Sequence, residues 1–264
     1  MNVLNLQGQL EPFSSNKVFL SAKRSGASPK LARQIAEDIE KQVYEGMKTS
    51  DIYKLVKKGL NREDKSSGYR FTLKQAIKDL GPSGFPFEKY VADIYEAHGY
   101  DIKTNVKVSG KYATHELDFV ARKGKDVLIG ECKFRKSSSD NIDLKTALRV
   151  HARWMDLMGG THFKGLNVKA IIVTNSRFSS QVIRYCNGHG IELLGWRYPK
   201  EGGLEKMIED EKLYPITILP SFRRGLIDDF CKERIMLAKD VMNNISIVDK
   251  NTLEKLRKEA SLLV

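Results

Sequence analysis

The chain has 264 residues and carries a formal net charge of +12 at pH 7, with a pI of about 9.4. This length exceeds that of a typical single domain, and the positive charge favours a polyanionic partner such as nucleic acid. The excess of Lys and Arg lies in residues 16–81 and 84–199, whereas residues 200–264 carry equal numbers of acidic and basic side chains. Phosphate contacts carry no sequence information, so the charge alone does not distinguish DNA from RNA.

The cysteines and the apolar runs exclude two classes of protein. Cys132, Cys186 and Cys231 are unevenly spaced and lack the partners of a zinc site, so a disulfide scaffold is not expected. The sequence has no charged leader before an apolar segment, and no apolar run long enough to cross a bilayer. We therefore expect a cytoplasmic protein that makes no membrane contact.

The N-terminal part is predicted to be a polar tail over residues 1–15 and a small, mostly helical domain over 16–81. A short strand is expected from Lys17 onward, ending in a turn. Ser28 and Pro29 then provide the cap and first position of a helix. Helices are predicted over residues 29–45, 50–60 and 71–80, and a hinge rich in Gly and Pro over 81–86.

This arrangement resembles the ATP-cone, a small nucleotide-binding regulatory domain known at the front of ribonucleotide reductases. A Lys-Arg-x-Gly sequence precedes the first long helix, and Gly-Met-Lys-Thr precedes the second. The resemblance implies that Lys23, Arg24 and Thr49 contact an adenine nucleotide, with ATP or dATP as an effector. Ser25 stands where that family usually has Asp, and the following segment is shorter than usual. A three-helix module in which Lys23 and Arg24 touch DNA phosphate remains the alternative.

Two strands around a turn rich in Gly and Lys carry the most informative residues of the chain. Asp118 lies before the turn, and Glu131 and Lys133 lie after it. With side chains alternating between faces, Asp118 is expected to project opposite Leu117 and Phe119, and Glu131 to project with Lys133. Crowded carboxylates raise one another's pKa unless a cation is bound between them. Oxygen ligands without a Cys/His set favour Mg²⁺ or Mn²⁺ over zinc.

A solvated hairpin whose charges merely face water is the alternative interpretation. The start of the second strand, residues 127–130, is nearly all apolar, as expected for a buried strand. Charges buried in such a strand destabilise the fold unless they are paired. This context favours a functional site.

The elements after the hairpin continue an alternating pattern. A long helix is predicted over residues 140–158, in which Lys145, Arg149 and Arg153 are spaced four residues apart along one side. This row suits the grip of a DNA phosphate backbone, although a solvated basic face explains the same spacing. A buried strand from Ala170, a helix over residues 181–188 and a strand over 191–195 follow in sequence order.

The order of helix, hairpin, helix, strand, helix and strand predicts an α/β sandwich around a mixed sheet. With its Asp and Glu-x-Lys residues, the region over 84–199 resembles the PD-(D/E)xK nuclease superfamily, and within it the Mrr-like restriction endonucleases. The resemblance implies a restriction-endonuclease-like mixed sheet flanked by helices. It also implies that Asp118, Glu131 and Glu88 hold the metal, and that Lys133 orients water or stabilises the transition state. Without the resemblance, Glu88 is an ordinary acid in a helical first turn.

The C-terminal residues 200–264 show the weakest pattern. An extended stretch is predicted over residues 213–219, and helices over 222–230, 233–242 and 251–263. Their similarity to a helix-hairpin-helix module is slight. A helical cap on the sheet or a dimerisation surface fits the neutral charge better.

These features predict a metal-dependent phosphodiester hydrolase, a DNA endonuclease regulated by ATP or dATP and active as a homo-oligomer. Two alternatives remain open. One is a structure-specific nuclease for branched or junction DNA, which would place two sites on opposite strands as a homodimer. The other is a non-cleaving nucleic-acid-binding protein that retains the fold, although the intact Asp118, Glu131 and Lys133 argue against it.

Overall fold

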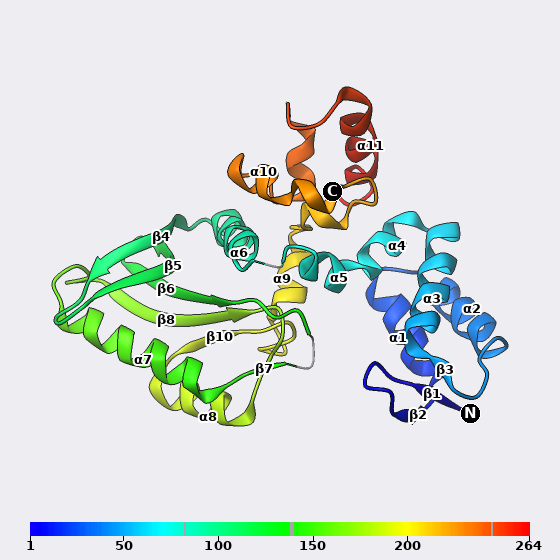
Figure 1. The fold of residues 1–264 in the computed structure, drawn as a ribbon, viewed down its shortest axis with the longest axis horizontal. Helices are drawn as coiled ribbons and strands as arrows, with labels where there is room; N and C mark the ends of the chain where they lie inside the picture. The colour runs from blue at the N-terminus through cyan, green and yellow to red at the C-terminus, as the bar shows by residue number, and fades with distance from the viewer. Residues whose placement is uncertain (82, 138–139, 244) are drawn as a thin grey trace.

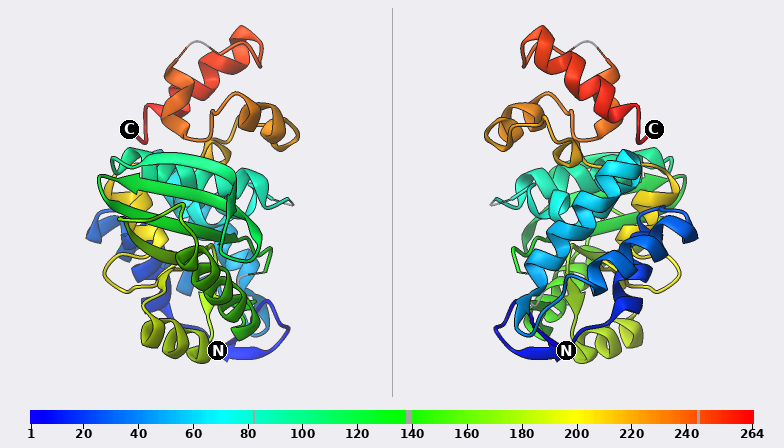
Figure 2. Two further views of the ribbon diagram at one scale, coloured as in Figure 1. Left: turned by 90° about the vertical axis from the view of Figure 1, so that its left-hand side faces the viewer. Right: turned by 90° about the vertical axis from the view of Figure 1, so that its right-hand side faces the viewer.

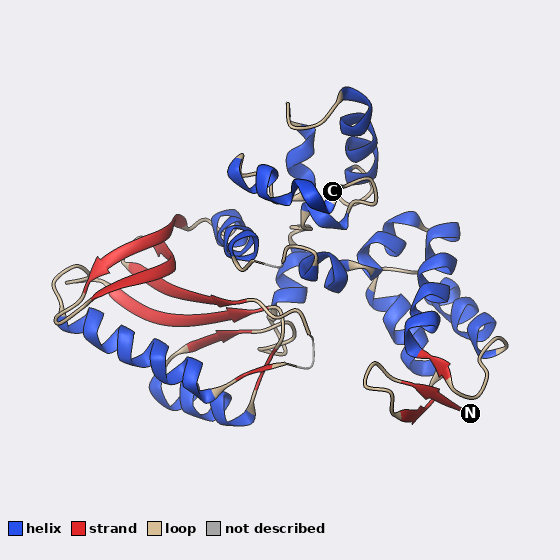
Figure 3. Cartoon of the chain, in the orientation of Figure 1, coloured by secondary structure: helices blue, strands red, loops and turns tan. Residues whose placement is uncertain are grey.

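The computed structural model describes residues 1–81, 83–137, 140–243 and 245–264. It contains a helical N-terminal unit, a central mixed sheet flanked by helices, and a helical C-terminal segment (Figures 1 and 3). The predicted α/β class with a mixed, restriction-endonuclease-like sheet is confirmed. The predicted hinge includes Pro82, which lies outside the described residues.

The central sheet has five strands in the order β10-β8-β6-β5-β4. Its members are β4 (Asp101–Ser109), β5 (Thr114–Lys123), β6 (Asp126–Lys133), β8 (Asn167–Thr174) and β10 (Glu192–Leu194). Strands β4, β5 and β6 are antiparallel neighbours, whereas β6, β8 and β10 run parallel. A separate parallel pair consists of β7 (Asn141–Ile142) and β9 (Arg177–Phe178).

Helices cover both faces of this sheet (Figure 1). They are α6 (Phe85–Ala97), α7 (Leu144–Gly159) and α8 (Ser180–His189). Asp143 and Ser179 cap α7 and α8 by accepting hydrogen bonds from backbone amides in the first turn. Helices α7 and α8 share one apolar cluster with the sheet, and α6 belongs to a second cluster on the other face. The predicted hairpin therefore lies between two cores.

The second cluster extends from α6 into the C-terminal segment, residues 200–264. Tyr90 on α6 is buried and donates a hydrogen bond to the carbonyl of Leu213 at 2.7 Å. Thr217 donates to the carbonyl of Ala76 at 2.6 Å. Figure 2 shows this segment beside α6 and away from α7 and α8. The segment therefore shares one continuous core with α6, the sheet and Ala76 of the N-terminal unit.

Several elements of the C-terminal segment differ from the prediction. It contains α9 (Leu204–Asp210), η1 (Ile216–Ile218), η2 (Arg224–Leu226), α10 (Ile227–Lys232), η3 (Ala238–Met242) and α11 (Lys250–Ala260). In place of the helices expected over 222–230 and 233–242, the structure has the shorter helix α10 and the 3-10 helix η3, whose buried side chains belong to one core. Asp249 caps the last helix by accepting a hydrogen bond from the amide of Thr252 at 2.9 Å.

The N-terminal unit, residues 1–81, contains more strand than predicted at its start. Its elements are β1 (Asn2–Leu4), β2 (Leu10–Pro12), α1 (Ser15–Arg24), α2 (Pro29–Glu40), β3 (Met47–Lys48), α3 (Thr49–Glu63), α4 (Lys65–Phe71) and α5 (Leu73–Lys78). The expectation of a polar tail over residues 1–15 is wrong. β1 pairs with both β2 and β3, because Val3 enters the core beside Met47.

The strand predicted from Lys17 is a helix, α1. Ser14 caps this helix by accepting from the amide of Lys17 at 3.2 Å. Val18 and Ala22, four residues apart, are its buried side chains. The apolar run therefore follows helical rather than strand spacing.

Gly130 on β6 provides a test of the packing between the two antiparallel strands. A Cβ atom there would lie 2.0 Å from the ring of Phe119. That ring is fully buried and packs 5.3 Å from the ring of Tyr95, so it has little room to move. Gly130→Ala is expected to lower the free energy of unfolding by about 1–3 kcal/mol in urea denaturation.

Gly188→Ala on α8 is the matched control. A Cβ at this helical glycine meets no atom within 4 Å. This substitution should leave stability unchanged or raise it by up to about 1 kcal/mol. Equal effects of the two substitutions would contradict the tight contact at Gly130.

Candidate active site

The candidate site forms where strands β5 and β6 separate. Their pairing begins at the turn and ends at Phe119 and Gly130. One residue further, Asp118 directs its side chain to the other strand, and its Oδ2 accepts a hydrogen bond from the amide of Cys132 at 2.6 Å. The carboxylate thus replaces the backbone partner that the strand separation removes.

The neighbouring strand β4 is also irregular at this point. Asn105 has a left-handed φ of 53° and lies between Thr104 and Val106, which pair with Phe119 and Leu117, the two neighbours of Asp118. Leu117 joins the core beneath α7 and α8, whereas Phe119 joins the core beneath α6. The prediction that these two side chains share a face is therefore wrong. A regular strand alternates faces, and the irregular backbone around Asp118 interrupts that alternation.

Glu131 is a buried carboxylate surrounded by cations. Its side chain is 5% exposed, and its Oε1 lies 2.5 Å from Lys133 Nζ and 2.9 Å from Arg149 Nη2. Its Oε2 accepts from Arg153 Nη1 at 2.6 Å. Burial opposes ionisation, but the hydrogen bond and charge of Lys133, with the charge of Arg153, hold the pKa of Glu131 below its ordinary value. Glu131 is therefore a carboxylate at neutral pH.

The predicted basic row on α7 divides into two parts. Arg149 and Arg153 bind Glu131, whereas Lys145 is exposed near the start of the helix. Arg149 remains 58% exposed and can also reach a ligand from solvent. The DNA-binding role of these residues remains a prediction, with Arg149 placed best for it.

Glu88 on α6 approaches the same space from the opposite face. Burial and the charge of Asp118 raise the pKa of Glu88 to about 7, and Glu131 adds to the increase while Lys133 opposes it. Burial and the charge of Glu131 likewise raise the pKa of Asp118. The structure thus brings the predicted Asp118, Glu131, Lys133 and Glu88 into one electrostatically coupled group.

We tested whether this group fits a divalent cation. Within the described part of the chain, no three His, Cys, Asp or Glu side chains are already gathered as a metal cluster. Both oxygens of Glu131 are held by cations, so Glu131 must exchange a contact before it binds a metal. The donors are nevertheless suitable, because Mg²⁺ and Mn²⁺ prefer carboxylate oxygens. Mutual repulsion between Glu88 and Asp118 is the condition that a cation relieves.

Sequence reasoning missed the residues that hold the site in place. Asp156 on α7 accepts from His115 Nε2 at 2.7 Å and from the amides of Tyr112 and Ala113. It thereby fixes the β4–β5 turn to α7, and His115 is a positioning residue. The place of His115 just before the acidic strand indicates such a role, but nothing in the sequence indicates Asp156, because it is distant along the chain from its partners.

The end of β6 is held by side chains of the adjacent strand. Thr174 donates to the carbonyl of Lys133 at 2.6 Å, and Asn175 exchanges two hydrogen bonds with the backbone of Arg135. Both residues are buried. A sequence signal existed here, since a buried apolar strand that ends in Thr and Asn indicates polar groups with a specific partner.

The predicted nucleotide-binding residues lie in the N-terminal unit. Lys23 and Arg24 are exposed in the last turn of α1, and Thr49 is the first residue of α3. Gly26 has a φ of 91°, and a Cβ there would lie 2.7 Å from the guanidinium of Arg70. The glycine in the Lys-Arg-x-Gly sequence therefore has a packing reason. Nucleotide binding stays a prediction.

The mixed sheet, with Asp118, Glu131 and Lys133 where its strands separate, defines a restriction-endonuclease-like domain. Residues 81–196 match the Mrr_cat family model, which describes a restriction endonuclease. An uncharacterised protein of Archaeoglobus fulgidus is 33% identical over 153 residues, which cover 58% of this chain and 84% of the relative. The chain belongs to the same family as this archaeal protein and contains a restriction endonuclease domain.

The fold of the chain is similar to that of a solved structure. The crystal structure of a protein of unknown function, AF1548, has a TM-score of 0.57 and 29% identity, covering 69% of this chain and 98% of that chain. MspJI restriction endonuclease in complex with a 27-mer oligonucleotide has a TM-score of 0.37 and 15% identity, covering 73% of this chain and 39% of that chain. The second similarity is too low to support an argument about either fold or site. Across the described residues, the helices are too short or too polar to span a lipid bilayer.

The raised pKa of Glu88 predicts a dependence of stability on pH. Because this pKa rises from 4.5 to about 7 on folding, the folded protein keeps a proton that the unfolded chain releases at lower pH. The stability contributed by protonated Glu88 is therefore complete below pH 4.5 and is lost as the pH rises to about 7. The measurement is urea unfolding of the parent and Glu88→Gln in EDTA over this range.

The free energy of unfolding of the parent, relative to Glu88→Gln, should decrease across the interval. Added magnesium should reduce this decrease, because a cation beside Glu88 favours its ionised form. A difference between parent and variant that does not change with pH would contradict the raised pKa of Glu88, which results from burial and from the charge of Asp118.

Proposed function

We propose that the protein is a divalent-metal-dependent endonuclease that hydrolyses phosphodiester bonds in DNA. The observation that carries the proposal is the meeting of Asp118, Glu131 and Lys133 at the separation of β5 and β6. The match of residues 81–196 to the restriction endonuclease family supports the reaction class and DNA as the partner. The positive charge of +12 is consistent with a polyanionic substrate.

In this proposal Asp118, Glu131 and Glu88 hold Mg²⁺ or Mn²⁺. When bound, the ion would supply a water of lowered pKa and neutralise charge on the phosphoryl oxygens. Asp118 keeps one oxygen on the Cys132 amide, which fixes the orientation of its carboxylate. Glu131 is already ionised and accepts ligands without losing a proton.

Lys133 is the group that acts on the phosphate. Its ammonium lies 2.5 Å from Glu131 and 3.3 Å from the carbonyl of Cys132, so it is held next to both acidic residues. It can donate a hydrogen bond to a phosphoryl oxygen or orient the attacking water. An incoming phosphate also competes with Glu131 for Arg149, which faces solvent. Substrate binding would thereby remove one of the two cations that contact Oε1 of Glu131.

Cleavage of DNA tests this proposal. Asp118→Asn and Lys133→Ala are each expected to reduce the rate of plasmid cleavage in magnesium or manganese by at least about a hundredfold, because each removes charge stabilisation at the reacting phosphate. Lys125→Ala is the matched control, since it removes an exposed lysine at the far end of the same hairpin. DNA binding in EDTA should persist in all three. Cleavage by Lys133→Ala at the parent rate would refute the assignment.

We further propose that the N-terminal unit binds ATP or dATP and regulates cleavage. Lys23 and Arg24 place two exposed cations at the end of α1. Gly26 follows them in a left-handed backbone conformation that glycine adopts more easily than other residues. Such cations suit the phosphates of a nucleotide.

Calorimetric titration tests the nucleotide proposal. The parent should release or absorb heat on titration with ATP or dATP, and Lys23→Ala should lose at least about tenfold in affinity, because a charge-assisted contact is worth about 1.5–3 kcal/mol. Lys30→Ala, which removes an exposed lysine from α2, is the control. No heat from the parent would remove the regulatory proposal.

A further inference from the structure

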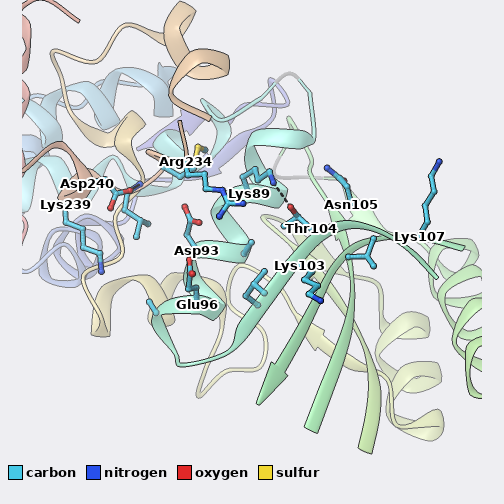
Figure 4. Close-up of a pocket in the computed structure, with 16 residues that line it drawn as sticks. Lys89, Asp93, Glu96, Lys103, Thr104, Asn105, Lys107, Arg234, Lys239 and Asp240 are labelled. Atoms are coloured by element: carbon cyan, nitrogen blue, oxygen red, sulfur yellow. Dashed lines mark hydrogen bonds between the residues drawn. The ribbon is translucent and has the colours of Figure 1, made fainter. Parts of the chain in front are cut away.

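A cavity separate from the carboxylate group lies between α6, β4 and the C-terminal segment (Figure 4). Its volume is about 790 Å³, which is within the range of ligand sites in proteins. The charged and amide residues that line it are Lys89, Asp93, Glu96, Lys103, Asn105, Lys107, Arg234, Lys239 and Asp240. Elements that are far apart in the sequence thus bring cations and carboxylates around one space.

The cations that line this cavity outnumber its carboxylates. Within the described residues, no ion pair involves Lys103, Lys107, Arg234 or Lys239. Lys89 donates to the hydroxyl of Thr104 at 2.5 Å instead of pairing with an acid. Unpaired cations gathered around a cavity favour an anionic ligand.

The backbone of the cavity is strained at two positions. Asn105 on β4 and Arg234 in the C-terminal segment have φ values of 53° and 57°. Such left-handed conformations are uncommon for residues other than glycine and persist where the surroundings hold them. Both residues line this cavity. Arg234 ends α10 in the left-handed conformation that is common after helices, with the amide of Ile235 donating to the carbonyl of Phe230 at 2.9 Å, so the irregular β4 backbone at Asn105 is the unusual feature of this lining.

The cavity also offers acceptors. Asp93 Oδ2 is buried and has no hydrogen-bond partner within the described residues. Burial, with the charges of Asp240 and Glu96, raises the pKa of Asp93 to about 7, while Lys89 and Arg234 oppose the increase. An unpartnered buried oxygen is unfavourable unless a ligand donates to it. The ligand therefore combines an anionic group with hydrogen-bond donors, as a nucleotide does in its phosphate and its sugar or base.

The cavity adjoins the candidate active site. Lys89 follows Glu88 on α6, and Asn105 lies between Thr104 and Val106, which pair with the two neighbours of Asp118 on β5. We propose that this cavity binds a nucleotide of the DNA strand beside the cleaved phosphodiester, with Lys103 and Lys107 on its phosphates and Asp93 accepting from its sugar or base. This inference rests on the proposed function, and it makes the C-terminal segment part of the substrate-binding surface.

Binding of DNA at graded salt concentrations tests the assignment. Fluorescence anisotropy in EDTA would compare the full-length parent with the double variant Lys103→Ala/Lys107→Ala, using single-stranded and duplex oligonucleotides. Loss of two phosphate contacts should reduce the slope of log K against log salt by about 1.4 for single strands and about 1.8 for duplex. Lys255→Ala/Lys258→Ala on α11 removes two exposed lysines and is the control for charge. Its slope should stay near that of the parent.

Equal salt-dependence slopes for the two double variants would overturn the cavity assignment. The nuclease proposal would not be affected by that result, because cleavage by the parent tests it separately. A reduced slope for Lys103→Ala/Lys107→Ala alone would support the cavity assignment even if the parent cleaves no DNA. Absence of cleavage by the parent would refute the nuclease proposal. Titration with dAMP distinguishes a free nucleotide from a nucleotide of the DNA strand as the ligand of the cavity. Binding of dAMP that requires Lys103 and Lys107, without a change in the DNA slope, would assign the cavity to a free nucleotide and overturn the strand assignment.

Discussion

The burial of the Glu131 carboxylate is the constraint on which the arrangement of the sheet domain depends. An ion inside a protein must be paired, and removal of a partner leaves an uncompensated charge. Glu131 obtains one partner from its own strand, Lys133, and two from α7, Arg149 and Arg153. These contacts fix the position of α7 over the sheet in addition to its apolar packing. The fold and the candidate chemistry therefore rely on the same group.

Helix α6 joins the two sites that the structure indicates. Glu88 faces the carboxylate group, and Lys89 and Asp93 line the cavity on the outer side of β4. The same helix anchors the C-terminal segment through Tyr90 and Leu213. A displacement of α6 would therefore change the acidic group, the cavity and the attachment of the C-terminal segment together.

The hairpin with Asp118, Glu131 and Lys133 could be predicted because alternation and a buried apolar run are local patterns. The irregularity at Asp118 could not, since it depends on the backbone of Asn105 and on the distant amide of Cys132. Likewise, the spacing of the α7 cations was visible, but their pairing with Glu131 depends on how α7 crosses the sheet. From Lys17 onward, side chains that favour β-structure suggested a strand. The segment is a helix because Ser14 caps it and because its buried residues, Val18 and Ala22, are four positions apart.

The cations around Glu131 also set the charge balance of the whole site. Glu88, Asp118 and Glu131 are matched by Lys133, Arg149 and Arg153, so the group is electrically neutral when all its members are ionised. Addition of one divalent ion to a neutral group would leave two positive charges. A phosphodiester gains a second negative charge when hydroxide adds to it, so the loaded site would match the transition state better than the singly charged substrate.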